Sequence, residues 1–523
     1  MKKLLIRTFI LRSTVVLLGL TSVTSLSSQV IQSTFSANGI SCTLKEGMLQ
    51  VDFVTPDIVR VQYTKEAKFV GNGTDVCVPR NQERVRFSHR KEAQHFWLKS
   101  DSLIVKVDIR TGAISYFDTN GSALLREDAM IPRVGTKVFT ERVTYDEASK
   151  RVEKTANGDI EVKTVLTRDT VGASWKYKMN FRWMPSEALY GLGSHMEDYM
   201  NLKGKELYLC QHNLKAMVPV INSTAGYGLL FDAGCSMLFR DTEEVGYVEL
   251  EAAKQIDYYF MKGKRMDAVI ANYRLLTGKS PMMPLYLFGY IQSKERYVSS
   301  DDLINTLKQF RQKQIPVDMI VQDWNYWPDG QWGRMSMNPT FYPDKKKLTD
   351  EIHAMNAKLM ISIWPNAVNS PQTDDFKQKG LLFNGTTVYD AFNPLGRDLY
   401  WNYANKEFFS NGFDAWWCDS SEPLDADWKF MDASYGPDSH ERRWKLNTEI
   451  LSDALGAERS QLYSLYHAMG IYENQRATNA SKRVVNLTRS SYAGQQRFST
   501  ITWNGDTHAT WKSFAQMIPA GLN

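Results

Sequence analysis

Two aspartates stand at points where an apolar strand pattern ends, and large aromatic residues precede both of them. Asp419 lies in the stretch WWCDSSEP (416–423), and Asp506 lies in WNGDT (503–507). Cleavage of a glycosidic bond requires two carboxyl groups, one to protonate the leaving oxygen and one to attack the anomeric carbon or activate water. Aromatic walls exclude water and favour a protonated carboxylic acid. The alternative is that each aspartate caps the helix after its strand.

The predicted strands in the second half of the chain, including those before Asp419 and Asp506, end in polar or aromatic residues. These strand-end residues are Gln292 and Ser293, Asp323 and Trp324, Trp364, Asp419, Arg489 and Asp506. In a parallel barrel the carboxyl ends of all strands meet on one face, which is where the active sites of such barrels lie. We therefore expect these side chains to converge.

The elements that must position these residues begin after Met266, where helix and strand patterns alternate. MDAVIANYRLLTG predicts a helix ending at Gly278, and LYLFGYIQS, after two prolines, predicts a short strand. Further helices are predicted at 301–313, 344–356, 397–410 and 439–456, and a last one leads to Asn523. Further strands begin at Asp318, Leu359, Phe413, Arg483 and Thr500. This alternation indicates parallel βα units, and the length favours a (β/α)₈ barrel over a doubly wound sheet. No Gly-x-Gly-x-x-Gly follows a strand, which weakens a dinucleotide-binding alternative.

The preceding part of the chain has a different pattern. Apolar and polar residues alternate in runs such as MLQVDFVTPDIVRVQY from Met48, SLIVKVDIRTGAISYFD from Ser102 and YVELEAAKQIDYYFM from Tyr247. A period of two predicts half-buried antiparallel strands, and a succession of them predicts a β-sandwich. At 523 residues the chain should hold at least two domains. The expected fold class is therefore a β domain over 29–265 followed by an α/β domain over 266–523.

Residues 1–28 are interpreted as a secretory signal peptide. Lys2, Lys3, Arg7 and Arg12 precede an apolar stretch from Val15 to Leu20, and small residues follow near Ser25 to Ser28. A membrane anchor is the alternative, but the apolar run is shorter than the roughly 20 residues that a spanning helix needs. We expect an exported protein, periplasmic or secreted, that has no membrane attachment after cleavage.

Charge and metal-ligand spacing exclude several classes of partner. Four of the five net positive charges lie in the segment 1–28, so the remainder is nearly neutral and gives no case for nucleic acid. The five cysteines and eight histidines form no Cys-x-x-Cys pair and no His-Glu-x-x-His block. We expect no catalytic metal and no cofactor, while disulfide pairing and oligomeric state stay open.

The two aspartate blocks resemble those of glycoside hydrolase family 31. WWCDSSEP is similar to the nucleophile block of that family, and WNGDTHATW is similar to its acid/base block. Other stretches match in order and spacing: EALYGLGSH (187–195), NSTAGYGLLFD (222–232), MPLYLFGYIQSKERY (283–297), VQDWNYW (321–327), WGRMSMNPTFYPD and ISIWP. The resemblance runs from about residue 30 to the end of the sequence. It implies a mutarotase-like β-sandwich at 29–265, a catalytic barrel at 266–523 and an oligosaccharide substrate.

The resemblance also implies a role for each residue. Asp419 would be the nucleophile and Asp506 the general acid/base of a retaining, double-displacement mechanism. Asp323 resembles a carboxylate that holds hydroxyls of the bound sugar, and Arg489 resembles an arginine that contacts the sugar near the acid/base residue. Trp364, Trp417 and Trp503 resemble residues that line the pocket, with barrel packing as the alternative. Glu422 is interpreted as a supporting residue.

The nature of the sugar is less constrained. FGY-x-QS-x-ERY followed by QDWNYW is most similar to α-xylosidases that trim xyloglucan fragments. Trp324 could fill the space of a hexose hydroxymethyl group and leave room for xylose. Alternatives are an α-glucosidase, a non-catalytic carbohydrate-binding protein and another barrel enzyme such as an isomerase or aldolase. Against the last alternative, no lysine of this chain stands at a strand end, where it could form a Schiff base.

The family pattern continues beyond Asn523, with two more barrel strands that carry an Asp-Ile-Gly-Gly-like block and a histidine. We therefore expect the barrel to be truncated after about its sixth strand. A sheet that lacks its last strands cannot close, so its edges stay unpaired. The expectation is that this polypeptide alone is poorly stable and nearly inactive, and that the assigned function is that of the intact enzyme.

Overall fold

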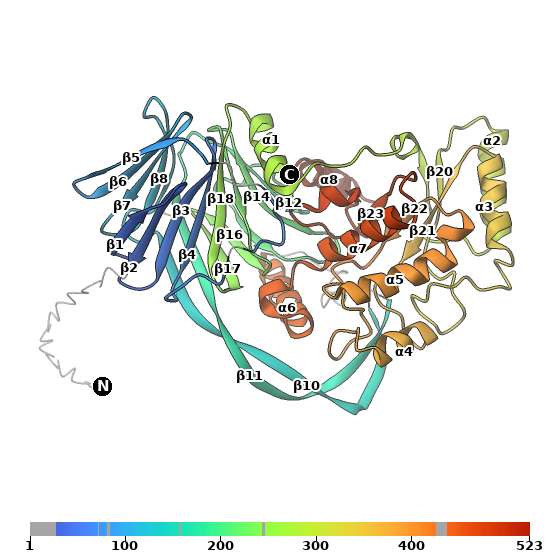
Figure 1. The fold of residues 1–523 in the computed structure, drawn as a ribbon. Helices are drawn as coiled ribbons and strands as arrows, with labels where there is room; N and C mark the ends of the chain where they lie inside the picture. The colour runs from blue at the N-terminus through green and yellow to red at the C-terminus, as the bar shows by residue number, and fades with distance from the viewer. Residues whose placement is uncertain (1–27, 72, 81–83, 156–157, 243–245, 425–436) are drawn as a thin grey trace, which may run out of the picture.

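A computed structural model describes residues 28–71, 73–80, 84–155, 158–242, 246–424 and 437–523 (Figure 1). The predicted signal peptide, residues 1–28, lies outside the described residues except for Ser28. Within the described part, no helix is long and apolar enough to cross a bilayer.

The N-terminal part is a sandwich of two large antiparallel sheets. The first sheet contains, in spatial order, β1 (Val30–Phe35), β2 (Gly39–Leu44), β3 (Met48–Thr55), β4 (Ile58–Thr64), β18 (Ile256–Lys262), β15 (Tyr227–Phe231), β14 (Ala216–Ser223) and β12 (Leu189–Ser194). The second contains β13 (Glu206–Leu209), β16 (Met237–Asp241), β17 (Gly246–Ala253), β11 (Gly158–Arg182), β9 (Ala123–Glu127), β8 (Ile114–Asp118), β7 (Leu103–Asp108), β6 (His95–Ser100) and β5 (Phe87–Glu92), with β10 (Arg133–Thr155) paired to β11.

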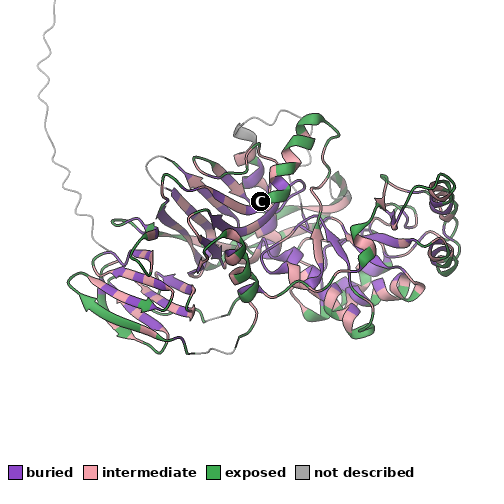
Figure 2. Ribbon diagram, turned by 90° about the horizontal axis from the view of Figure 1, so that it is seen from above, coloured by how far each residue is buried: buried purple, intermediate pink, exposed green. Residues whose placement is uncertain are grey.

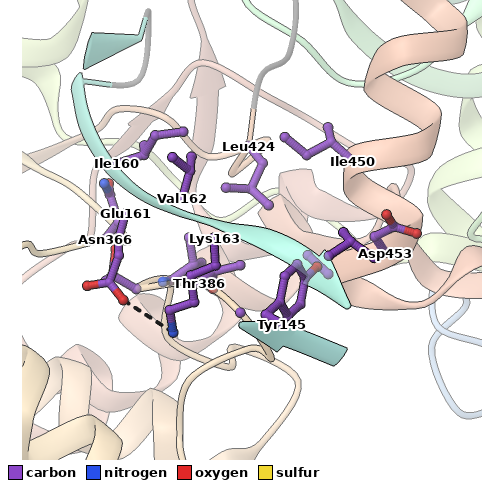
Figure 3. Close-up of a pocket in the computed structure, with 15 residues that line it drawn as sticks. Tyr145, Ile160, Glu161, Val162, Lys163, Asn366, Thr386, Leu424, Ile450 and Asp453 are labelled. Carbon is purple, nitrogen blue, oxygen red and sulfur yellow. Dashed lines mark hydrogen bonds and ion pairs between the residues drawn. The ribbon is translucent and has the colours of Figure 1, made fainter. Parts of the chain in front are cut away.

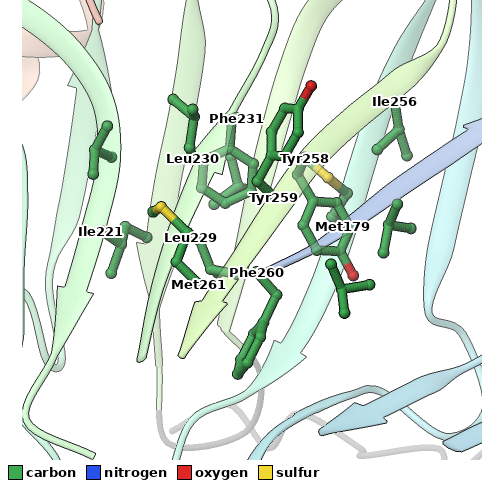
Figure 4. Packing of buried hydrophobic residues seen from close by; sticks show 14 of the residues in the cluster. Met179, Ile221, Leu229, Leu230, Phe231, Ile256, Tyr258, Tyr259, Phe260 and Met261 are labelled. Atoms are coloured by element: carbon green, nitrogen blue, oxygen red, sulfur yellow. The ribbon is translucent and has the colours of Figure 1, made fainter. Parts of the chain in front are cut away.

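The core of the sandwich explains the alternating sequence pattern. On β17 every second residue from Gly246 to Leu250 is buried, as a strand with one solvated face requires. The central strand β18 is instead buried on both sides, because helix α1 (Met266–Thr277) covers its outer face. Figure 4 shows its aromatic residues Tyr258 and Phe260 among the aliphatic side chains of β14 and β15.

Strands β10 and β11 form a hairpin much longer than the short strands predicted for this region. It extends from the sandwich along the barrel (Figure 1). Both guanidinium nitrogens of Arg168 bond the carboxylate of Asp453, at 2.8 and 2.7 Å, and the side-chain amide of Asn384 donates to the carbonyl of Val143 at 2.8 Å. The hairpin therefore bridges the two parts of the chain.

The second part is built on six parallel strands that lie side by side in sequence order. They are β19 (Ile291–Gln292), β20 (Met319–Gln322), β21 (Lys358–Ile363), β22 (Ala415–Cys418), β23 (Asn486–Thr488) and β24 (Thr500–Thr502), with β19 and β24 at the edges. The helices after α1 are α2 (Ser300–Gln312), α3 (Lys345–Ala354), α4 (Pro371–Gln378), α5 (Pro394–Glu407), α6 (Pro437–Leu455), α7 (Tyr463–Thr478) and α8 (Trp511–Leu522). Buried residues concentrate on the strands (Figure 2). The predicted fold class, a β-sandwich followed by barrel-type βα units, is confirmed.

The structure corrects one predicted strand and adds two helices. Residues Leu285–Phe288 form a single 3₁₀ turn, and only Ile291–Gln292 pair as a strand. Leu285 and Phe288 are 85% and 74% exposed, so their hydrophobicity did not mark a buried strand. Helices α4 and α7 were not predicted. Helix α7 is buried on several sides and therefore lacks the polar stripe from which a helical period is read.

The hydrophobic core of the sandwich extends into the second part of the chain. Leu462, Leu465 and Ala468 at and within α7 pack in the same buried cluster as the sandwich strands. The indole N–H of Trp444 donates to the carbonyl of Leu209 at 3.1 Å. The sandwich therefore sits directly against the barrel, close to the carboxyl ends of its strands.

Candidate active site

Side chains on the parallel sheet alternate between the helix layer and the barrel interior. The interior cluster consists of Met319 and Val321 of β20, Met360 of β21, Ala415 of β22, Val485 just before β23, and Leu487 of β23. Two residues after Val321 comes Asp323, four after Ala415 comes Asp419, and two after Leu487 comes Arg489. Because the period of a strand is two, all three side chains belong to the interior face, at its carboxyl end.

Arg489 joins the predicted residues into one network. Its Nη1 lies 3.0 Å from Oδ1 of Asp419 and 3.5 Å from Oδ2 of Asp506, and its Nη2 forms an ion pair with Glu422. The side chain of Arg489 is 1% exposed, whereas that of Asp506 is 59% exposed. The arginine is thus a buried anchor, and Asp506 faces the open side of the site.

These contacts limit the separation of the two aspartates. One nitrogen lies 3.0 Å from one carboxylate oxygen and 3.5 Å from the other, so the two oxygens are at most about 6.5 Å apart. Retaining glycosidases place their carboxyl groups about 5–5.5 Å apart, and inverting ones place them about 6.5–9.5 Å apart. The upper limit for Asp419 and Asp506 is compatible with the retaining spacing and lies below nearly all of the inverting range.

Charge and burial set the protonation of this cluster. Burial raises the pKa of Asp419, the guanidinium of Arg489 lowers it, and the charges of Asp506 and Glu422 raise it again. Burial, together with the charge of Asp419, raises the pKa of Asp323 to about 8. One arginine supplies a single positive charge to several carboxylates, so a proton is retained in the cluster at neutral pH.

Local hydrogen bonds fix the carboxylates. The backbone N–H of Ser420 donates to Oδ1 of Asp419 at 2.6 Å, and that of Trp324 donates to Oδ1 of Asp323 at 2.8 Å. Glu422 is buried, and it accepts a hydrogen bond from the hydroxyl of Ser490 at 3.0 Å. Its partners are therefore Ser490 and Arg489 rather than the open site, in keeping with a supporting position.

The tryptophans form two groups beside the carboxylates. The rings of Trp417 and Trp503 lie 4.7 Å apart, and both pack on the barrel interior. Trp324 lies 5.4 Å from the ring of Trp332, which lies 5.2 Å from Trp364. Trp364 is only 4% exposed, so it packs mainly behind this wall.

The sequence did not reveal one residue of the site, Asn213, which comes from the sandwich. Its side-chain amide donates to Oδ2 of Asp506 at 2.6 Å. The two residues are 293 positions apart, and no local pattern connects them. The one local feature that could have pointed to this contact is the glycine in WNGD, because a glycine lets another segment come close to the backbone.

Two cavities of the structure do not include the carboxylates of the site. One, of about 210 Å³, lies between the hairpin and the barrel and is lined by Tyr145, Val162 and Leu424 (Figure 3). The other, of about 640 Å³, is lined by Leu214, Thr507 and His508, which flank Asn213 and Asp506 in sequence. Among the residues that the structure describes, no cluster of three His, Cys, Asp or Glu side chains is arranged to hold a metal ion.

Comparison with known proteins decides the family. Residues 280–523 match the model described as "Glycosyl hydrolases family 31 TIM-barrel domain". Residues 48–239 match "Glycosyl hydrolase 31 N-terminal galactose mutarotase-like domain". The chain belongs to glycoside hydrolase family 31. The predicted resemblance is thereby confirmed for both parts of the chain.

Relatives within family 31 include enzymes of several names. An "Alpha-xylosidase" of Saccharolobus solfataricus is 32% identical over 489 residues, which cover 91% of this chain and 60% of that protein. An "Uncharacterized family 31 glucosidase ORF2" of Pseudescherichia vulneris is 25% identical and covers 93% and 89%. An "Alpha-glucosidase" of Saccharolobus solfataricus is 25% identical and covers 54% and 44%. The chain thus spans about three fifths of the length of the α-xylosidase relative.

Solved structures agree on the family 31 fold. The α-xylosidase of Xanthomonas citri superposes with a TM-score of 0.76 at 21% identity, covering 93% of this chain and 67% of that one. An α-xylosidase from a soil metagenome, complexed with xylose, gives 0.76 at 23% identity and covers 94% and 70%. At these identities the likeness supports the fold and no finer property.

Proposed function

We propose that this protein is a retaining α-glycosidase in which Asp419 is the nucleophile and Asp506 is the general acid/base. The observation that carries the proposal is the contact of one buried arginine, Arg489, with both carboxylates. That contact limits the two carboxylate oxygens to a separation of at most about 6.5 Å, which is compatible with the short spacing of a covalent mechanism. Membership of family 31 supports this chemistry, and the network around Arg489 supports the choice of residues.

The first step would form a glycosyl-enzyme ester. Asp419 attacks the anomeric carbon while the bond between that carbon and the leaving oxygen breaks. Asp506 transfers its proton to the leaving oxygen. In the second step Asp506 removes a proton from water, and the water oxygen displaces Asp419 from the sugar. Two inversions return the sugar with its original α configuration and restore both side chains.

The surrounding residues would bind the sugar. Asp323 carries a raised pKa of about 8 and therefore can hold a proton between itself and a sugar hydroxyl near neutral pH. Trp417 and Trp503 offer aromatic faces on the inner wall. Arg489 stabilises the ionised nucleophile and would also contact the sugar.

For the sugar we propose α-xylose, released from the non-reducing end of xyloglucan-type oligosaccharides. The α-xylosidase relative at 32% identity supports this choice. Trp324 adds a physical reason, because it follows Asp323 directly and its ring belongs to the aromatic wall formed with Trp332. A bulky indole there would occupy the space of a hydroxymethyl group. The α-glucosidase relatives keep a hexose substrate as the competing specificity.

Two further parts of the proposal concern organisation and location. We propose boundaries of 29–265 for the mutarotase-like sandwich and 266–523 for the catalytic barrel part. We also propose that residues 1–28 are removed during export to the periplasm or medium. N-terminal sequencing of the protein from its native host tests the cleavage, and an intact Met1 would contradict it.

The test of function compares two substrates that differ by one hydroxymethyl group. The intact enzyme, to which the function is assigned, is assayed with nitrophenyl α-xyloside and nitrophenyl α-glucoside, with Asp419→Ala as the inactive control. Faster turnover of the xyloside supports the α-xylosidase, and faster turnover of the glucoside makes the protein an α-glucosidase. Xylose or oligosaccharide binding without turnover of either substrate would instead indicate a carbohydrate-binding protein.

A further inference from the structure

We infer that Asn213, a residue of the N-terminal sandwich, positions Asp506 for proton transfer, so that the sandwich supplies part of the catalytic machinery. The inference rests on the proposed role of Asp506. It concerns a positioning residue, because Asn213 acts through the carboxylate it holds.

Asn213 and Asp506 are joined by two hydrogen bonds, which together are called the grip below. The Nδ2 of Asn213 donates to Oδ2 of Asp506 at 2.6 Å, and the backbone N–H of Asp506 donates to Oδ1 of Asn213 at 2.9 Å. The backbone donor fixes which end of the amide is oxygen, because only the oxygen can accept that hydrogen bond. Asn213 itself is 1% exposed.

The grip selects one oxygen of the carboxyl group. Both the amide of Asn213 and Nη1 of Arg489, at 2.6 and 3.5 Å, address Oδ2 of Asp506. An oxygen that accepts two donors is a poor place for a proton, so these contacts leave Oδ1 as the oxygen suited to exchange a proton with the substrate. Because the side chain is 59% exposed, little besides these contacts restricts its rotamer. The grip therefore keeps Oδ1 aimed in one direction.

The turn that presents Asn213 is anchored and tightly made. His212 and Lys215 exchange backbone hydrogen bonds at 3.3 and 2.9 Å, which places Asn213 and Leu214 at its tip. Leu214 has φ +78°, in the left-handed region that a leucine rarely adopts. The side chain of Gln211 donates to the carbonyl of Ser491 at 2.7 Å, beside the Arg489 loop. Backbone strain of this kind persists where surrounding contacts enforce it.

The catalytic loop is shaped to receive the turn. Gly505 has φ +74°, and a Cβ placed on it would stand 2.4 Å from Oδ1 of Asn213 and 2.6 Å from the backbone nitrogen of Leu214. Only glycine permits so close an approach. The glycine of the WNGD block thus has a physical reason. It makes room for Asn213, which belongs to the sandwich and lies 292 residues before Gly505 in the chain.

The test separates proton donation from general damage. Wild type, Asn213→Ala and Asn213→Asp are assayed with a dinitrophenyl α-glycoside, whose leaving group needs no protonation, and with a disaccharide, whose leaving group does. We expect kcat/KM for the disaccharide to fall about 100-fold, as a misplaced catalytic group does, while that for the dinitrophenyl glycoside changes less than about threefold. The matched control is Asn180→Ala, a buried sandwich asparagine whose amide donates to the carbonyl of Ile131 at 2.7 Å. It should leave the ratio of the two values unchanged.

Two outcomes would overturn the inference. An equal loss on both substrates would mean that Asn213 only maintains the fold, and no loss on either would mean that the grip is dispensable. If the intact enzyme hydrolyses neither substrate, the proposed function fails, and crystal structures then decide the inference separately. An Asp506 side chain displaced in Asn213→Ala supports positioning, and an unmoved one refutes it.

Discussion

Replacement of Arg489 by methionine should change the pH dependence of the reaction more than any other property. Arg489→Met keeps a flexible apolar stem, shorter than that of arginine, and removes the positive charge 3.0 Å from Asp419. Asp419 attacks only when ionised, so activity is lost as the pH falls through its pKa. Arg489 lowers that pKa, and its removal therefore raises it and moves the acid limb to higher pH.

The size of the effect follows from the geometry. An opposite charge within about 4–6 Å lowers a carboxyl pKa by about 1–3 units, and both side chains of this pair are at most 13% exposed. The acid limb of kcat/KM should thus move upward by about 1–3 pH units, equivalent to about 1.4–4 kcal/mol. The loss should be greatest at acidic pH and should diminish as the pH rises above the new limb.

The assay is kcat/KM for a nitrophenyl α-glycoside measured across the pH range of enzyme stability. Arg133→Met is the matched control, because Arg133 forms an equally buried ion pair with Glu127 in the sandwich, at 3.0 Å. Each variant should lose about 3–5 kcal/mol of stability, since each leaves a buried carboxylate uncompensated. Only Arg489→Met should move the acid limb. An active Arg489→Met enzyme with an unchanged acid limb would show that Arg489 does not lower the pKa of Asp419.

Three other predictions concern single residues of the site. Asp419→Ala should lower kcat by more than about 10⁴-fold on aryl glycosides while sugar binding by calorimetry persists; retained turnover would exclude it as nucleophile. Trp324→Leu should raise the glucoside-to-xyloside ratio of kcat/KM about tenfold; an unchanged ratio would remove Trp324 from specificity. Gly505→Ala should impair disaccharide hydrolysis more than dinitrophenyl glycoside hydrolysis, because its Cβ would collide with Asn213; equal effects would argue against this contact.

The sequence was sufficient to predict the barrel part of the site, because strand periodicity is local. Asp323, Asp419 and Arg489 each follow an apolar strand, and a period of two places them on the interior face. Parallel topology then brings neighbouring strand ends together without any knowledge of loop structure. The ion pairs of Arg489 with Asp419 and Asp506 are the physical result. The catalytic roles assigned to these residues remain proposals.

Contacts between the two parts of the chain could not be predicted in the same way. The grip of Asn213 on Asp506 depends on a turn whose tip includes a left-handed leucine, Leu214, and no residue-type preference marks such a turn. The reach of the β10–β11 hairpin was missed because each of its strands reads as ordinary short alternation. Helix α7 was missed because it is buried on several sides. In each case tertiary packing, rather than local propensity, determines the structure.

Identification of the covalently labelled residue tests directly whether Asp419 is the nucleophile. The protein is incubated with a fluorinated α-glycosyl fluoride whose glycosyl-enzyme hydrolyses slowly, then digested and analysed by mass spectrometry. We expect a single sugar adduct, on Asp419, and no adduct in Asp419→Ala. An adduct on Asp506 or Asp323, or steady turnover with no adduct at all, would contradict this expectation.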